Sequence, residues 1–128
     1  MKYTIMVMKS PYSHEKPRTA ILFTHALLEL GHVIDMIFFY SDGVLHANTM
    51  LTIENDEFNV SYEWQKLSMQ FGFSLHICSN SANKRGLIEL NKAKELGFGK
   101  SNINTYFKLS GLLELVNSIQ NSDRIVQF

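Results

Sequence analysis

The sequence is poor in cysteine and proline: a single cysteine, Cys78, and two prolines stand among its 128 residues. One cysteine cannot form a disulfide within the chain, so a thiol that exchanges sulfur here must react with a sulfur of another molecule. Long apolar runs are also absent. The N-terminal apolar stretch ends at Met8, which makes it too short for a signal peptide or a membrane span. We therefore expect a soluble, cytoplasmic protein without a membrane partner.

An excess of either charge is missing as well. Twelve basic and twelve acidic residues cancel to a formal net charge of zero. Strong binding to nucleic acid needs a positive surface for phosphate contacts, so we expect no strong, direct binding of tRNA or other nucleic acids. The composition, 45% hydrophobic and 19% charged, is that of one ordinary globular domain over residues 1–128.

Cofactor and metal signatures are not found either. There is no G-x-G-x-x-G motif and no Walker loop. The segment after the first predicted strand has no glycine and contains Pro11, which argues against the phosphate loop of a flavin binder. Cys78 is not in a C-x-x-C frame, and the histidines show no close metal-ligand pairing; they are His14, His25, His32, His46 and His76. We therefore expect neither a cofactor nor a metal site.

What the sequence does contain is an alternation of strand and helix patterns. Apolar, β-branched runs predict strands at 3–8, 33–40, 73–77 and 123–128, with a short edge strand at 105–107. Helical spacing predicts helices at 17–30, 61–71, 79–85, 90–96 and 110–119, the last one capped by Ser110. This order predicts a three-layer α/β/α sandwich with a mostly parallel sheet of four or five strands. The polar stretch 41–59 is expected to be a long loop.

Cys78 lies where the third predicted strand gives way to the helix-capping residues Ser79, Asn80 and Ser81. In parallel α/β folds, reactive groups gather at the carboxyl ends of strands. The free N–H groups of a helix start favour a thiolate over a thiol, and the thiolate is the reactive form. Lys84 or Arg85 would add to this effect if its side chain folds back toward the sulfur. The sequence thus makes Cys78 the candidate catalytic residue.

Two other readings of Cys78 stay open. A free cysteine is often a small, inert core residue, so burial alone could explain it. A cysteine phosphatase would need an arginine at the position that Lys84 occupies, and Arg85 comes one residue too late. Because a lysine cannot supply the planar, two-pronged grip of a guanidinium, a phosphatase is the weaker of the two alternatives.

Short motifs follow one another in a characteristic order along nearly the whole chain. None is specific alone, whereas their order and spacing together are. They are Phe38-Phe39-Tyr40, Asp42-Gly43-Val44, Ala47-Asn48, Asp56-Glu57-Phe58, Trp64 with Leu67, Ile77-Cys78, Arg85-Gly86, Leu96-Gly97, Ser101-Asn102, Phe107 with Leu109-Ser110-Gly111-Leu112, Asp123-Arg124 and Val126-Gln127-Phe128. With these motifs the chain resembles the DsrE-like sulfurtransferases, and most closely their sulfur-relay members.

The resemblance implies a sulfurtransferase with a DsrE-like fold in which Cys78 carries sulfur as a cysteine persulfide. It implies that the sulfane sulfur comes from the small donor TusA and passes to the acceptor TusE, in the 2-thiolation of the wobble uridine of tRNA. It further implies a heterohexamer with the paralogous subunits TusB and TusC. The competing hypothesis is a non-catalytic assembly subunit of such a complex, with Cys78 merely buried.

This sequence departs from the family pattern just after the cysteine. The family has mainly small, apolar residues there, whereas this chain has Ser79, Asn80, Ser81 and Asn83. We expect this polar rim to change the surroundings of the thiol while leaving the role of Cys78 in place.

Overall fold

A five-stranded parallel sheet, in the order β4-β3-β2-β1-β5, forms the centre of the computed structural model, which describes residues 1–128. All four neighbouring pairs run parallel. The strands are β1 (Lys2–Val7), β2 (Val33–Phe39), β3 (Ser74–Cys78), β4 (Phe107–Ser110) and β5 (Arg124–Gln127). The predicted fold class is confirmed.

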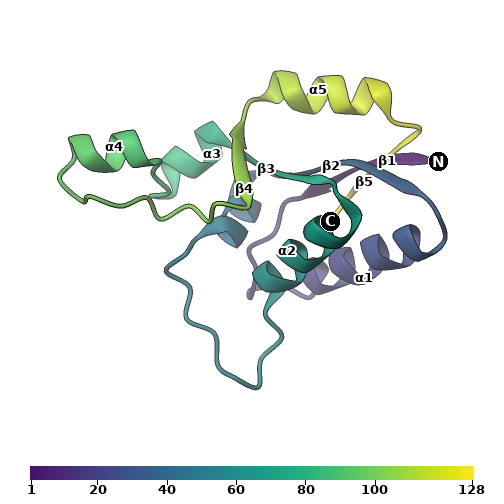
Figure 1. Cartoon of the computed structure of the whole chain (residues 1–128), viewed down its shortest axis with the longest axis horizontal. Coiled ribbons are helices and arrows are strands. Elements are labelled where there is room, and N and C mark those ends of the chain that lie inside the picture. Colours follow the sequence, from purple (N-terminus) through teal and green to yellow (C-terminus); the bar gives the residue numbers. More distant parts are fainter.

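Helices cover both faces of the sheet, which gives the predicted three layers (Figure 1). α1 (Lys16–Glu29) and α2 (Val60–Phe71) lie together on one face, and α5 (Leu112–Asn121) lies on the other. Two short helices, α3 (Ser79–Lys84) and α4 (Leu90–Glu95), lie beyond β4 at the side of the sheet. No helix is both long and apolar enough to cross a membrane.

Local sequence signals explain where α2 begins and ends. Asn59 caps its start, because the side-chain oxygen accepts a hydrogen bond of 3.1 Å from the backbone N–H of Tyr62. Gly72 follows its last turn with a φ of 78°, a left-handed conformation that glycine adopts without steric cost. The buried residues Trp64 and Leu67 hold the helix against the sheet.

The core on the α1 and α2 side is centred on Phe39 of β2, which is fully buried. Its ring centroid lies 5.6 Å from that of Trp64 and 5.2 Å from that of Phe107, with the rings edge to face. A third ring, that of His46, lies 5.0 Å away. Phe39 thus joins α2, β4 and the segment after β2 to one core.

The face under α5 contains a buried polar cluster instead. Thr4 of β1 is fully buried, and its hydroxyl lies 2.7 Å from the hydroxyls of both Ser118 and Ser122. Ser118 also donates to Asp35 of β2. Leu115 and Ser118 are the buried residues of α5, and Ile119 packs against the core from a partly buried position, so hydroxyl contacts add to a limited apolar contact.

The stretch after β2 is more ordered than predicted. Residues 41–59 were expected to form one long loop, but η1, a 3₁₀ helix, occupies Ser41–Ala47. Val44 and Ala47 are fully buried, so two apolar side chains hold this segment onto the sheet. The polar composition of the whole stretch concealed these two anchors.

Two details near β4 differ from the sequence predictions. The edge strand predicted at 105–107 instead runs over Phe107–Ser110. Ser110 is consequently the last strand residue, and the cap of α5 is Gly111, whose backbone N–H donates to the Glu114 side chain over 2.9 Å. Parallel pairing with β3 decides the strand position, and this is a long-range contact that local patterns do not show.

Candidate functional site

The carboxyl ends of β1, β2 and β3 meet beneath η1. The Tyr40 backbone N–H, at the end of β2, donates to the Val7 carbonyl of β1 over 3.0 Å. Gly43 of η1 lies so close to the same strand that a Cβ there would be 2.0 Å from the Val7 carbonyl oxygen. Only glycine allows this approach, so η1 packs directly against the backbone of β1.

Cys78 is the last residue of β3 and the N-cap of α3, as the sequence predicted. Its Sγ accepts a hydrogen bond of 3.5 Å from the backbone N–H of Ser81. The residue is 4% exposed and belongs to the main apolar cluster. The sulfur therefore has a polar contact at the helix start but is covered by the protein around it.

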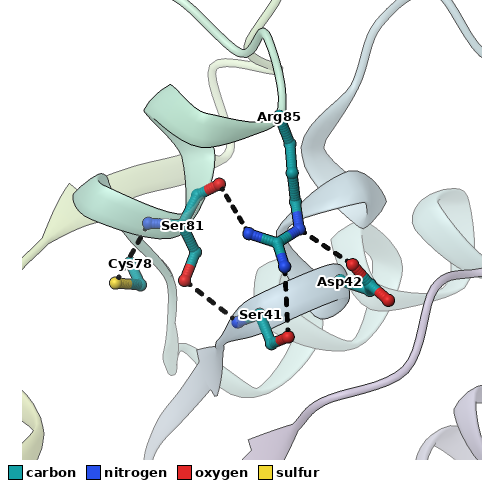
Figure 2. A network of polar contacts seen from close by, with 5 residues as sticks. All are labelled: Ser41, Asp42, Cys78, Ser81 and Arg85. Carbon is teal, nitrogen blue, oxygen red and sulfur yellow. Dashed lines mark hydrogen bonds and ion pairs between the residues drawn. The ribbon is translucent and has the colours of Figure 1, made fainter.

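A network of hydrogen bonds ties α3 to η1 next to this cysteine (Figure 2). The Ser81 hydroxyl accepts from the Ser41 backbone N–H over 3.1 Å. Arg85 donates to the Ser81 carbonyl and to the Ser41 hydroxyl, each over 3.2 Å, and to the Asp42 carboxylate over 2.8 Å. One guanidinium thus links three groups from two segments, which suits its fixed fork of donors.

Arg85 does not assist the sulfur in the way the sequence suggested. Figure 2 shows its guanidinium turned toward Ser41 and Asp42, with the Cys78 sulfur on the other side of Ser81. Lys84 is exposed and makes no ion pair. Charge assistance from α3 is therefore not built into this arrangement.

Ser41, at the junction of β2 and η1, is the one residue other than glycine with a positive φ, 54°. Such a conformation costs about 1 kcal/mol or more for a residue with a side chain. Its backbone N–H and its hydroxyl are both used, by Ser81 and Arg85. The network around α3 thus holds a strained residue in place.

The polar residues that depart from the family pattern divide into two kinds. Ser81 belongs to the network just described, and the Ser79 hydroxyl donates to the Ser110 carbonyl of β4 over 3.1 Å. Asn80 and Asn83 are exposed. The serines thus fasten the segment after Cys78 to its neighbours on both sides.

A histidine that the sequence patterns did not assign to the site lies two residues before Cys78 on β3. His76 of β3 is half-buried, and its Nδ1 is hydrogen-bonded to the hydroxyl of Ser110. Burial lowers the pKa of His76, and Lys108 adds to this, while Glu114 and Asp35 oppose it. Strand alternation, which puts residues two apart on the same face, was the signal that could have found it.

His46 of η1 is a core residue. It is 1% exposed, and its Nε2 lies 3.1 Å from the Lys9 carbonyl oxygen. Burial lowers its pKa to about 3. His25 lies 3.7 Å from Glu29 on α1, and His32 contacts the N-terminal amine. The structure brings no three His, Cys, Asp or Glu side chains together in a way that could hold a metal ion.

Comparison with known proteins agrees with the motifs. A family model described as the DsrE/DsrF-like family matches residues 1–128. The protein named Sulfurtransferase TusD of Buchnera aphidicola subsp. Acyrthosiphon pisum (strain 5A) is 44% identical over 128 residues, which is the full length of both chains. The protein of the same name from Salmonella newport (strain SL254) is 40% identical over the same span.

Among solved structures, the crystal structure of the ychN protein from E. coli matches with a TM-score of 0.79. The match covers 100% of this chain and 99% of that chain at 19% sequence identity, so it supports the fold alone. The names of the sequence relatives support the sulfurtransferase activity that the sequence predicted. By its full-length match to the family model and to these relatives, the chain belongs to the DsrE/DsrF-like family.

Proposed function

We propose that this chain is a sulfur carrier whose Cys78 holds sulfane sulfur as a persulfide. The main support is the full-length identity of 44% to a protein named Sulfurtransferase TusD. Two features of the chain agree with it. Cys78 is the only cysteine, and it stands at the carboxyl end of a parallel strand, where α/β folds place their reactive groups.

The transfer we propose is a thiolate exchange without net oxidation. The Cys78 thiolate attacks the outer sulfur of a donor persulfide, so that a new S–S bond forms at Cys78. The original S–S bond breaks, and the donor leaves as its thiolate. In the second step an acceptor thiolate attacks the outer sulfur on Cys78 and restores the Cys78 thiolate. Donor and acceptor are separate molecules, because this chain has no second cysteine.

We further propose the relay that the relatives' name suggests. TusA supplies the sulfur, TusE receives it, and the chain works with TusB and TusC in a heterohexamer that serves 2-thiolation of the tRNA wobble uridine. The net charge of zero supports a role in which tRNA is bound by another protein. Pull-down of a tagged chain from cells that express all three subunits tests the complex, since recovery of the chain alone would contradict it.

A second function is supported by the burial of the thiol. Cys78 is 4% exposed and packs within the apolar cluster. A subunit that only assembles with catalytic paralogues would need nothing more of this residue. The sulfur carrier, by contrast, requires that the cover over Cys78 opens when a donor binds.

Sulfur loading distinguishes the two functions. The purified chain is mixed with a persulfide donor, and its intact mass is measured. The carrier is expected to gain one sulfur atom, whereas Cys78→Ser gains none, although both proteins fold. Equal mass gains for the two proteins would contradict the carrier. Alkylation of the native protein at neutral pH gives a second readout, because a thiol that stays covered reacts slowly, whereas a thiol whose cover opens and that ionises reacts fast.

A further inference from the structure

The face of the sheet that carries Cys78 also carries a titratable side chain, that of His76. His76 and Cys78 are two residues apart on β3, so strand alternation turns both side chains to the same face. Ser110 is the residue of β4 paired with Cys78. Its hydroxyl bonds to His76, so it lies on this face too. Neighbouring strands are about 4.8 Å apart, and Ser110 is thus adjacent to both residues.

We propose that His76 and Ser110 control the reactivity of Cys78, with His76 as a positioning residue that acts through the Ser110 hydroxyl. The inference rests on the proposed function, because it gives that function's Cys78 a pH-dependent neighbour. His76 does not touch the reacting sulfur. Its effect depends on which way the serine hydroxyl donates.

Hydrogen-bond counting shows how the pair would act. A neutral imidazole has one acceptor nitrogen, so the Ser110 hydroxyl can donate its proton to Nδ1 of His76. The lone pairs of the Ser110 oxygen then face the groups around it. A protonated imidazole has only donors. Nδ1 then donates to Ser110, and the serine proton must point elsewhere. The neighbouring Cys78 sulfur can accept it, which stabilises the thiolate.

Ser110 is shielded from solvent and is tied to its neighbours. The residue is 6% exposed, so solvent does not compete for its hydroxyl. Its carbonyl is already bound by the Ser79 hydroxyl. The charged groups that face His76 are Lys108 of β4, Glu114 of α5 and Asp35 of β2. The effects of these charges partly offset one another, and burial lowers the pKa of His76 from its ordinary value, so its protonation needs a lower pH than that of a free histidine.

The test is the pH profile of Cys78 alkylation by iodoacetamide, a reaction that needs no sulfur donor. The wild type is expected to show a second inflection below pH 6.5, the ordinary value for histidine. On its acid side the wild type should react about three- to tenfold faster than His76→Asn. Asparagine keeps a hydrogen bond to Ser110 but does not titrate. His25→Asn, a change on the exposed side of α1, is the matched control and should leave the inflection in place.

The variant Ser110→Ala distinguishes an effect of His76 that passes through the Ser110 hydroxyl from a direct effect of the His76 charge on Cys78. Loss of the inflection in both Ser110→Ala and His76→Asn supports the proposal. An inflection that survives in Ser110→Ala, or a single ionisation in the wild type, overturns it.

Should Ser110→Ala fail to fold, NMR titration of the His76 ring decides instead. Linkage is reciprocal, so Cys78→Ala must shift the His76 titration and leave that of His25 unchanged, and an unchanged His76 overturns the proposal.

The outcome is independent of the sulfur-carrier test. A chain that takes up sulfur but shows one ionisation in alkylation keeps its proposed function and loses this inference. A chain that shows the histidine-linked inflection but takes up no sulfur keeps the His76–Ser110 pair and loses the proposed function.

Discussion

The Nε of Arg85 donates to the carboxylate of Asp42 over 2.8 Å, and this ion pair joins α3 to η1 directly beside the candidate site. The Arg85 side chain is 27% exposed and that of Asp42 62% exposed. An exposed pair of this kind contributes only about 0–1 kcal/mol by itself. The further bonds of Arg85 to Ser41 and Ser81 make it a link between two segments.

Replacing this arginine should loosen η1 more than it destabilises the fold. In Arg85→Lys the charge stays but the forked donor is lost, so the bonds to Ser41 and Ser81 cannot all be kept. We expect faster hydrogen exchange over 41–47 and a loss of about 1 kcal/mol in unfolding free energy. Lys84→Gln is the control, and equal exchange in the two variants would contradict the link.

Gly43→Ala should be among the most damaging small substitutions in the chain. The new Cβ would lie 2.0 Å from the Val7 carbonyl oxygen, a backbone atom that cannot turn aside. We expect a cost of about 3 kcal/mol or more, measured by urea unfolding. Gly111→Ala is the matched control, because there the nearest atom is the flexible end of the Glu114 side chain at 3.2 Å. A similar urea midpoint for both variants would argue against close packing of η1 on the backbone of β1.

His46 should make the fold sensitive to acid. Its pKa is about 3 in the fold, against 6.5 for an ordinary histidine, so unfolding takes up a proton between these values. Unfolding free energy should therefore fall as pH drops from 6.5 toward 3, by at most about 1.4 kcal/mol per pH unit. His46→Gln should flatten this slope in denaturant titrations at several pH values. His14→Gln, at an exposed position, should leave it unchanged.

The hydroxyl cluster under α5 gives a test with a matched pair of threonines. Thr4 and Thr24 are both fully buried. Thr4→Val leaves the Ser118 and Ser122 hydroxyls without this shared partner, and we expect a loss of about 1–3 kcal/mol. Thr24 bonds only to the Ala20 carbonyl in its own helix, so Thr24→Val should cost less than half as much. Thermal unfolding measures both, and equal costs would show that the cluster adds no more stability than the single bond of Thr24.

The sequence patterns predicted the layers of the fold because long apolar runs and helix caps are local signals. Gly72, for example, ends α2 as expected. The same reasoning found the junction at Cys78, since capping residues follow an apolar run there. It missed the 3₁₀ helix, because its anchors Val44 and Ala47 sit within an otherwise polar stretch.

Relationships across the sheet were beyond the reach of local patterns. Whether Arg85 turns toward Cys78 or toward Asp42 depends on where η1 lies, and that is decided by contacts between distant segments. The pairing of Cys78 with Ser110 likewise needs the register of β3 and β4. The catalytic role of Cys78 stays a prediction, supported by the relatives and by its place at the end of β3.

The way α5 is attached bears on how the molecule comes apart. Because Leu115 and Ser118 are the only buried residues of α5, this layer has little apolar area to lose when it detaches. In mild denaturant α5 should therefore detach from the sheet before the rest of the structure unfolds. That partly open form would set β1 and β2 in water on one side while the Phe39 core stays intact on the other.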